Sequence, residues 1–368
     1  MMAAVTIPAS FDALTPEWLT RTLRGNGHLD DATVTGVQFE PVGQGVGLLC
    51  QLARLTLTYD SAAPGAPRSL VVKIPTTDPR TREMVSVFRF YEREVRFYRD
   101  LAAALALPTP RCYYGEVEPA SGDFILLLED LSTSRLGDQL SGCSIEDARL
   151  IVREMARLHA TWWESPRLEG LPWMPVTSDP INKAGVAMYP QAWPIFLERF
   201  GHALPETIRH TGEKLGVEVG NILDRFDGGP RTICHGDLRQ DNLFFATRPG
   251  DPPLTVIDWQ ISVQGTGTYD VGYFMSQSLD TALRRNHEEE LLKLYHGLLL
   301  EGGVRDYSHE QMLEHYRWTL LFCFAYPVMG GGLGDLSNER GYQLAETMMH
   351  RSAAAIMDWD AGALIRDA

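Results

Sequence analysis

The sequence lacks the features of zinc-finger, disulfide-stabilised and nucleic-acid-binding proteins. Its five cysteines include no pair at CxxC spacing, and their number is odd. It also lacks an excess of bases, since 33 Lys and Arg stand against 48 Asp and Glu, a formal net charge of −15. Because nucleic acids and anionic membranes are bound through basic surfaces, both are excluded as main partners. We expect reduced thiols and a cytoplasmic protein.

Long apolar segments are scarce as well. Residues 1–18 have no basic region followed by an apolar core, so we expect no signal peptide. The longest uncharged run, residues 318–334, contains Pro327 and several glycines. It therefore predicts a buried helix that ends in a loop rather than a membrane span.

The first 130 residues alternate apolar and polar positions over several short segments. This pattern predicts strands at 32–42, 48–60, 69–75, 112–118 and 123–131. Helices are expected at 15–25 and, between the third and fourth strands, at about 80–105. The order β-β-β-α-β-β indicates an antiparallel sheet with one helix.

From Ser144 onward the apolar residues recur at three-four spacing, which is typical of helices. We expect helices at 144–163, 190–202, 205–226, 284–302, 308–326 and 339–358, with short strands near 243 and 254. The 368 residues suffice for two lobes. The predicted class is therefore α+β, with a small antiparallel-sheet N-lobe and a larger, mainly helical C-lobe.

A dense polar loop, HGDLRQDN, occupies residues 235–242 and is followed by an apolar Leu-Phe-Phe. Asp237 and Asn242 stand five positions apart in it, and Asp258 ends a later strand. Two carboxylates and an amide are hard oxygen ligands of the kind that Mg²⁺ prefers. The alternative is a polar turn with Asx caps and no ligand.

Lys73 interrupts the otherwise apolar strand at 69–75. It is either a solvent-facing side chain or a buried cation, and a buried cation needs a partner. The following helix offers Glu92 and Glu94. Between the first two predicted strands, a glycine loop would let backbone approach a phosphate closely, with glycines at Gly43, Gly45 and Gly47.

These motifs, in this order, resemble the kinase-like small-molecule phosphotransferases, the group of aminoglycoside phosphotransferases, choline kinases and ecdysteroid-kinase-like proteins. The resemblance covers about residues 40–300. It rests on VVKIP (71–75), EREVRFYRDL (92–101), LLLEDL (126–131), HGDLRQDN (235–242) and VIDW (256–259).

The resemblance implies a two-lobed protein-kinase-like fold, with residues 1–131 as the nucleotide-binding lobe and 132–368 as the catalytic and substrate-binding lobe. It also implies roles for single residues. Asp237 is expected to be the catalytic base, and Arg239 to contact the γ-phosphate. Asn242 and Asp258 are expected to hold Mg²⁺.

For the nucleotide, the resemblance implies that Lys73 contacts the α- and β-phosphates and is paired with Glu94, with Glu92 as the alternative. Adenine is expected at the backbone of Glu129 to Leu131. ATP is the expected nucleotide, and GTP is not excluded. His235 is expected to brace the loop, and Asp270 to anchor it or to cap the next helix.

The chain departs from the protein-kinase pattern in ways that favour a small acceptor. His-Gly-Asp replaces His-Arg-Asp, and Tyr269 follows Asp258 by only eleven positions, too few for a peptide-binding segment. The expected function is ATP- and Mg²⁺-dependent O-phosphorylation of a small molecule. The alternatives are a catalytically idle nucleotide-binding protein and a nucleotidyl transferase.

The acceptor pocket is expected beside a helical insert at about 165–230. This insert and the residues just before it are rich in aromatics, which either cage an ammonium group, line a lipophilic pocket or pack as core. The sequence leaves the acceptor and the oligomeric state open.

Overall fold

The structure, a computed structural model, describes residues 7–43 and 49–365. The chain divides into two compact units, each with its own core. The first comprises Met1–Leu105 with Thr109–Ser134, and the second Ala106–Pro108 with Arg135–Ala368.

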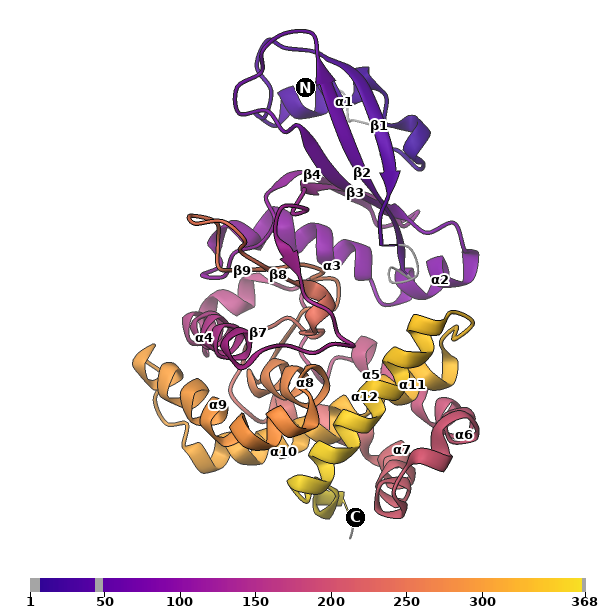
Figure 1. Cartoon of the computed structure of the whole chain (residues 1–368), viewed down its shortest axis with the longest axis vertical. Coiled ribbons are helices and arrows are strands. Elements are labelled where there is room, and N and C mark those ends of the chain that lie inside the picture. Colours follow the sequence, from indigo (N-terminus) through magenta and orange to yellow (C-terminus); the bar gives the residue numbers. More distant parts are fainter. Residues whose placement is uncertain (1–6, 44–48, 366–368) are drawn as a thin grey trace. The chain divides into compact units, whose positions relative to one another are not determined.

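The first unit contains a five-stranded antiparallel sheet (Figure 1). In spatial order its strands are β1 (Val34–Pro41), β2 (Cys50–Tyr59), β3 (Ser69–Pro75), β5 (Asp123–Glu129) and β4 (Cys112–Glu118). The expected β-β-β-α-β-β order is therefore confirmed, apart from the helix that separates the third and fourth strands.

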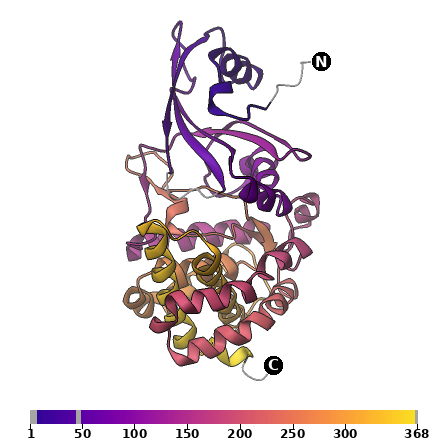
Figure 2. The same cartoon turned by 90° about the vertical axis from the view of Figure 1, so that its right-hand side faces the viewer.

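Helix α1 (Pro16–Gly25) covers one face of this sheet (Figure 2). Thr15 caps the helix by accepting a hydrogen bond from the backbone N–H of Trp18. The α1 side chains pack with Leu70, Val72 and Ile74 of β3 in one core. Because strand side chains alternate between faces, Lys73 points to the opposite face.

The single helix expected at 80–105 is wrong. The chain forms α2 (Pro79–Val87), α3 (Phe90–Arg96), a π-helical turn (Phe97–Leu101) and a 3₁₀ turn (Ala102–Ala104). Arg89 separates the first two in a left-handed conformation with φ 55°. Its guanidinium bonds to Glu92, and the flanking Phe88 and Phe90 rings stack 5.4 Å apart. A left-handed residue ends a helix because it turns the backbone out of the helical path.

The second unit is mainly helical (Figure 1). Its helices are α4 (Ile145–Trp162), α5 (Pro180–Val186), α6 (Tyr189–Phe200), α7 (Glu206–Asp227), α8 (Thr268–Ser278), α9 (Thr281–Glu301), α10 (His309–Cys323), α11 (Ala325–Leu333) and α12 (Glu339–Asp358). Two small sheets pair β10 (Val263–Gly265) with β7 (Thr232–Cys234), and β8 (Leu243–Phe245) with β6 (Arg135–Leu136) and β9 (Leu254–Val256). The predicted α+β class is confirmed.

Residues 318–334 form parts of two helices rather than one helix and a loop. Pro327 lies in the first turn of α11, where a missing N–H costs little. Gly332 allows α11 to approach α6, because a Cβ there would lie 2.5 Å from the Ala192 carbonyl oxygen. Among the described residues, no helix has the length and apolarity needed to traverse a bilayer.

Candidate active site

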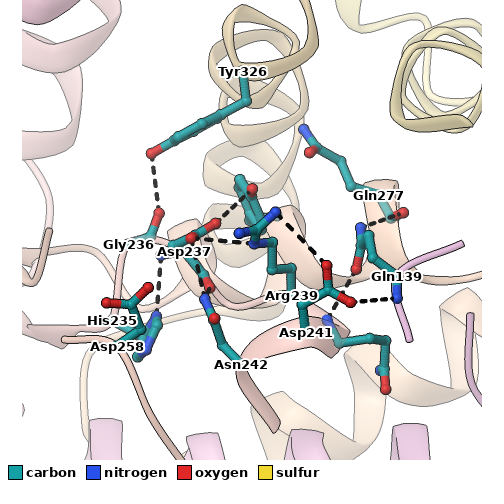
Figure 3. A network of polar contacts seen from close by, with 12 residues as sticks. Gln139, His235, Gly236, Asp237, Arg239, Asp241, Asn242, Asp258, Gln277 and Tyr326 are labelled. Carbon is teal, nitrogen blue, oxygen red and sulfur yellow. Dashed lines mark hydrogen bonds and ion pairs between the residues drawn. The ribbon is translucent and has the colours of Figure 1, made fainter. Parts of the chain in front are cut away.

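The polar loop lies between two short buried strands of the second unit, β7 and β8. Its first turn requires glycine at position 236, where φ is +86° and a Cβ would lie 2.6 Å from the Ile261 carbonyl oxygen. The loop closes with a 3₁₀ turn, Gln240–Asn242. The apolar flanks therefore fix both ends of the loop, and its polar side chains gather at one place (Figure 3).

Asp270 of α8 anchors the start of this loop. Its fully buried carboxylate accepts hydrogen bonds from the backbone N–H groups of His235 (2.7 Å) and Gly236 (2.9 Å). His159 Nε2 lies 3.3 Å from the same carboxylate. Buried carboxylates need such donors, and here the donors are the backbone of the loop itself.

His235 braces the loop against the strand that precedes Asp258. Its Nδ1 accepts a hydrogen bond from the Asp237 N–H at 3.1 Å, and its Nε2 lies 2.8 Å from the Ile257 carbonyl oxygen. Since a carbonyl oxygen can only accept, the ring is the neutral tautomer with hydrogen on Nε2. Both nitrogens are occupied, so His235 positions the loop, as its sequence context indicates.

Asp237 presents a carboxylate whose two oxygens are held differently (Figure 3). Oδ1 accepts a hydrogen bond from the Tyr273 hydroxyl at 2.8 Å. Oδ2 accepts one from Asn242 Nδ2 at 3.1 Å and lies 3.3 Å from Arg239 Nε. The side chain keeps 17% of its surface exposed, so a substrate can still reach it.

Arg239 lies between two carboxylates of the loop. Besides Asp237, its guanidinium lies 4.0 Å from Asp241 Oδ2. The Asp237 charge raises the pKa of Arg239 against the effect of burial, and Asp241 adds to it. Its charge is therefore fixed next to the candidate base.

Asp241 connects the loop to α12. Its Oδ1 accepts hydrogen bonds from the Gln139 N–H and from Arg340, each at 3.0 Å, and Arg340 also bonds to Asp138. Asp241 Oδ2 is buried without a hydrogen-bond partner among the described residues. The Arg340 contact joins residues 99 positions apart, which no motif in the sequence indicates.

Asn242 and Asp258 lie at the ends of neighbouring strands. The Asn242 carbonyl oxygen accepts a hydrogen bond from the Ile257 N–H at 3.0 Å, which places the residue before Asp258 beside Asn242. Asp258 has a left-handed backbone with φ 67°, a conformation that aspartate tolerates and that often marks functional sites. An amide oxygen and a carboxylate fit the ligand preference of Mg²⁺.

A second cluster, His159, Cys234 and Asp270, has ligand atoms within 4.8 Å of one another. These groups are instead hydrogen-bonded: His159 Nδ1 to the Tyr295 hydroxyl, and the Cys234 thiol to the Thr266 carbonyl oxygen. Burial raises the pKa of the Cys234 thiol well above its usual value, so it remains a protonated thiol. The cluster is a buried support for the loop.

In the first unit, Lys73 pairs with Glu94. Its Nζ lies 2.7 Å and 2.8 Å from the two carboxylate oxygens. Both side chains are buried, with 9% and 1% exposed. Glu92, the alternative partner, bonds to Arg89 instead.

Three of the other predicted nucleotide contacts, Gly43, Glu129 and Leu131, lie within the described residues. Gly43 has φ +68°, and Gly45 and Gly47 lie outside the described residues. Glu129 ends β5, and its side chain accepts a hydrogen bond from the Arg111 N–H. Leu131 follows in the loop, where its carbonyl oxygen accepts a hydrogen bond from the Ser134 N–H.

Most aromatic side chains in and next to the predicted insert are core rather than a cage. Tyr189, Trp193, Phe196 and Phe200 follow one another along α6 with ring centroids 5.4–5.9 Å apart, and all are buried. Trp162 and Trp173 are buried as well, and Trp163 is half-buried against Tyr307. The packing alternative therefore describes this region.

Three tyrosines around the loop were not predicted from the sequence. Besides Tyr273, the hydroxyls of Tyr269 and Tyr326 donate to the Gly236 carbonyl oxygen at 3.1 Å and 3.0 Å. They come from α8 and α11, and the Tyr273 and Tyr326 rings meet edge to face at 4.7 Å. A tyrosine in a buried helix gives no signal in the sequence that its hydroxyl reaches a site.

Comparison with known proteins places this site in a family context. The model of the phosphotransferase enzyme family matches residues 62–308, more than half of the chain. An uncharacterized kinase-like protein of Caenorhabditis elegans is 23% identical over 303 residues, covering 75% of this chain and 79% of the relative. The chain spans only 41% of a second relative, an uncharacterized oxidoreductase of the same organism, at 20% identity.

Two solved structures share the fold. A choline kinase from Cryptosporidium parvum has a TM-score of 0.52 at 13% identity, covering 94% of this chain and 98% of that chain. An ethanolamine kinase from Plasmodium vivax has a TM-score of 0.50 at 13% identity, covering 89% and 83%. At these identities the likeness shows the fold.

Proposed function

Because this chain belongs to the phosphotransferase enzyme family, we propose that it transfers the γ-phosphate of ATP to a hydroxyl of a small molecule. The observation that best supports this is the Asp237 carboxylate, which is held on both oxygens, partly exposed and mounted on an anchored loop. A carboxylate so placed can accept the proton of an alcohol and direct its oxygen.

In this proposal the loop residues have separate tasks. Arg239 would contact the transferred phosphoryl group, because its guanidinium is adjacent to the base and its charge is fixed. Asn242 and Asp258 would hold a magnesium ion. Magnesium, when bound, neutralises the negative charge of the phosphates.

The nucleotide contacts in the first unit are also proposals. Lys73, held by Glu94, would bind the α- and β-phosphates, and the backbone of Glu129 to Leu131 would receive the adenine. The Lys73 ammonium is oriented by both carboxylate oxygens of Glu94, which limits its freedom before a nucleotide arrives. GTP is the alternative nucleotide, since the positions of the backbone N–H and C=O groups decide whether adenine or guanine is bound.

The test is nucleotide turnover over a panel of amino alcohols, sugars, antibiotics and lipophilic alcohols, with magnesium present. We expect one or more acceptors to gain about 80 Da by mass spectrometry, the mass of a phosphoryl group. Asp237→Asn should lower acceptor-dependent turnover by at least a hundredfold, because the amide cannot take the proton. Nucleotide affinity, measured by calorimetry, should stay within a fewfold.

The matched control is Asp306→Asn. Asp306 is exposed and has φ 58°, a conformation that asparagine also adopts, so turnover should not change. Full turnover in Asp237→Asn would contradict the role of the base. Nucleotide binding without any transfer would favour an idle binding protein, and an adduct of the mass of AMP would favour nucleotidyl transfer.

A further inference from the structure

Three side chains of the described part of the chain reach the Asp237 carboxylate, and they divide unequally between its oxygens. Oδ2 accepts a hydrogen bond from Asn242 and faces the Arg239 guanidinium at 3.3 Å. Oδ1 has the Tyr273 hydroxyl, at 2.8 Å, as its hydrogen-bond donor among the described residues. A carboxylate offers about four acceptor positions, two on each oxygen.

This division indicates which oxygen is available to a substrate. The second lone pair of Oδ2 faces a fixed positive charge, which disfavours a proton there. Oδ1 retains a lone pair beside a neutral hydroxyl. An incoming alcohol is therefore best received at Oδ1, the oxygen that Tyr273 holds.

Tyr273 is itself held in place. It lies on α8, all of whose residues are buried, and 1% of its own surface is exposed. Its ring packs edge to face with Tyr326, whose hydroxyl bonds to the Gly236 carbonyl oxygen. Asp270, three residues earlier on the same helix, holds the loop backbone. One helix thus fixes both the backbone of the loop and the side chain of the base.

The Tyr273 hydroxyl can only donate in this contact, because an ionised carboxylate has no hydrogen to give. Burial, with the adjacent Asp237 charge, raises the pKa of Tyr273 well above its usual value. The hydroxyl is therefore a permanent donor. Without it, rotation of the carboxylate would be limited on the Oδ2 side alone.

From this geometry we propose that Tyr273 is a positioning residue, which fixes the carboxylate plane of Asp237 so that Oδ1 faces the acceptor hydroxyl. The inference rests on the proposed function. In the transfer, the acceptor O–H bond breaks as its oxygen bonds to the γ-phosphorus. The proton passes to Oδ1, and the nucleoside diphosphate leaves with the electron pair of the broken P–O bond.

The first test is Tyr273→Phe, which removes the hydroxyl and keeps the ring. We expect kcat to fall about ten- to a hundredfold, the effect of losing one hydrogen bond to a charged group. KM for the nucleotide should stay within twofold, because Tyr273 contacts the carboxylate of Asp237, the proposed catalytic base. A purely structural role would instead lower the active fraction or change both constants.

The matched control is Tyr316→Phe. Tyr316 is also fully buried and also donates its hydroxyl to a buried carboxylate, that of Glu288 on α9. The Tyr316→Phe variant should lose about as much stability as Tyr273→Phe, and its kcat should stay at the wild-type value. An equal loss of kcat in both variants, or an unchanged kcat in Tyr273→Phe, overturns the proposal.

Two further measurements require no activity. A crystal structure of Tyr273→Phe should show the Asp237 carboxylate rotated from its wild-type plane, and an unmoved carboxylate overturns the proposal. 3-Fluorotyrosine placed at position 273 keeps the wild-type shape, and its ¹⁹F resonance should shift when Asp237→Asn is added. An unmoved resonance also overturns it. If no acceptor is phosphorylated, the proposed function fails. The crystal structure and the ¹⁹F resonance still test whether the Tyr273 hydroxyl holds the Asp237 carboxylate.

Discussion

At the scale of single residues, the buried ion pair of the first unit shows how one position can serve both stability and function. Lys73 stands on the face of β3 opposite the main core, and Glu94 projects from α3 to meet it. Burying two charges costs free energy that the pair and its hydrogen bonds must offset. Such a pair is sensitive to loss of one member.

We therefore expect Lys73→Met to destabilise the protein by about 3–5 kcal/mol, because the Glu94 carboxylate would stay buried without the ammonium. Urea denaturation measures the change. The double variant Lys73→Met/Glu94→Leu should recover much of the loss, since no buried charge is left. Lys293→Met, which breaks an exposed pair with Glu289, should cost less than about 1 kcal/mol. Equal losses at both lysines would contradict the buried-pair argument.

The sequence predicted the positions of these residues better than their partners. Lys73 stands out as the charged residue of an otherwise apolar strand, but the sequence does not decide between Glu92 and Glu94 as its partner. That choice depends on the left-handed Arg89, which resets the helix register and binds Glu92 itself. Tyr273 was beyond prediction, because its hydroxyl meets Asp237 across 36 residues and only through the tertiary fold.

At the scale of elements, close helix packing in the second unit depends on glycines without a local signal. Gly212 of α7 faces the Trp193 ring of α6, where a Cβ would lie 2.2 Å from a ring carbon. Gly220 lies on the same helix with nothing within 4 Å of its Cβ position. The two positions offer a direct comparison within α7.

Gly212→Ala should destabilise the protein by about 1–3 kcal/mol, because the indole must move within a packed core. Gly220→Ala should stabilise it by up to about 1 kcal/mol, because alanine favours a helix and meets no obstacle here. Thermal and urea unfolding of both variants test the difference. If both alanines stabilised, the contact between α6 and α7 would be looser than the structure shows.

Element boundaries were predictable where caps and alternation were clear. Strands β3 and β4 and helix α12 have the predicted bounds. The buried helix α8 was missed, since a helix buried on all sides shows no separate apolar stripe in its sequence. Helix α11 was missed as well, because the glycines and Pro327 of the run 318–334 were taken as a sign of a loop.

At the scale of the whole molecule, the second unit explains why the acceptor was not predictable. Most of the aromatic residues that stand out in the sequence are buried in the core around α6. The base instead belongs to a chain of ion pairs, in which Arg239 faces Asp237 and Asp241, and Arg340 faces Asp241 and Asp138. Such contacts join distant segments, so their pattern cannot be read from spacing along the chain.

The whole chain also provides a redox prediction, since all five cysteines are free thiols. Burial raises the pKa of Cys112 and of Cys143 to about 12, and those of Cys234 and Cys323 well above the usual value. At pH 8 about one in ten thousand of the Cys112 or Cys143 thiols is therefore ionised. Because folding raises the pKa values of these thiols, the protonated thiols contribute their full stabilisation of the folded state below about pH 9. This contribution is lost as the pH rises toward 12.

We expect all five thiols to react at once with a disulfide reagent in guanidinium chloride. Under native conditions at pH 8, Cys112, Cys143, Cys234 and Cys323 should react at least a hundredfold more slowly than a free thiol. The midpoint of thermal unfolding should not depend on reductant, because no disulfide constrains the unfolded chain. Fewer than five reactive thiols in denaturant, or a midpoint lowered by reductant, would contradict the structure. Rapid native reaction of these four would show that their burial is incomplete.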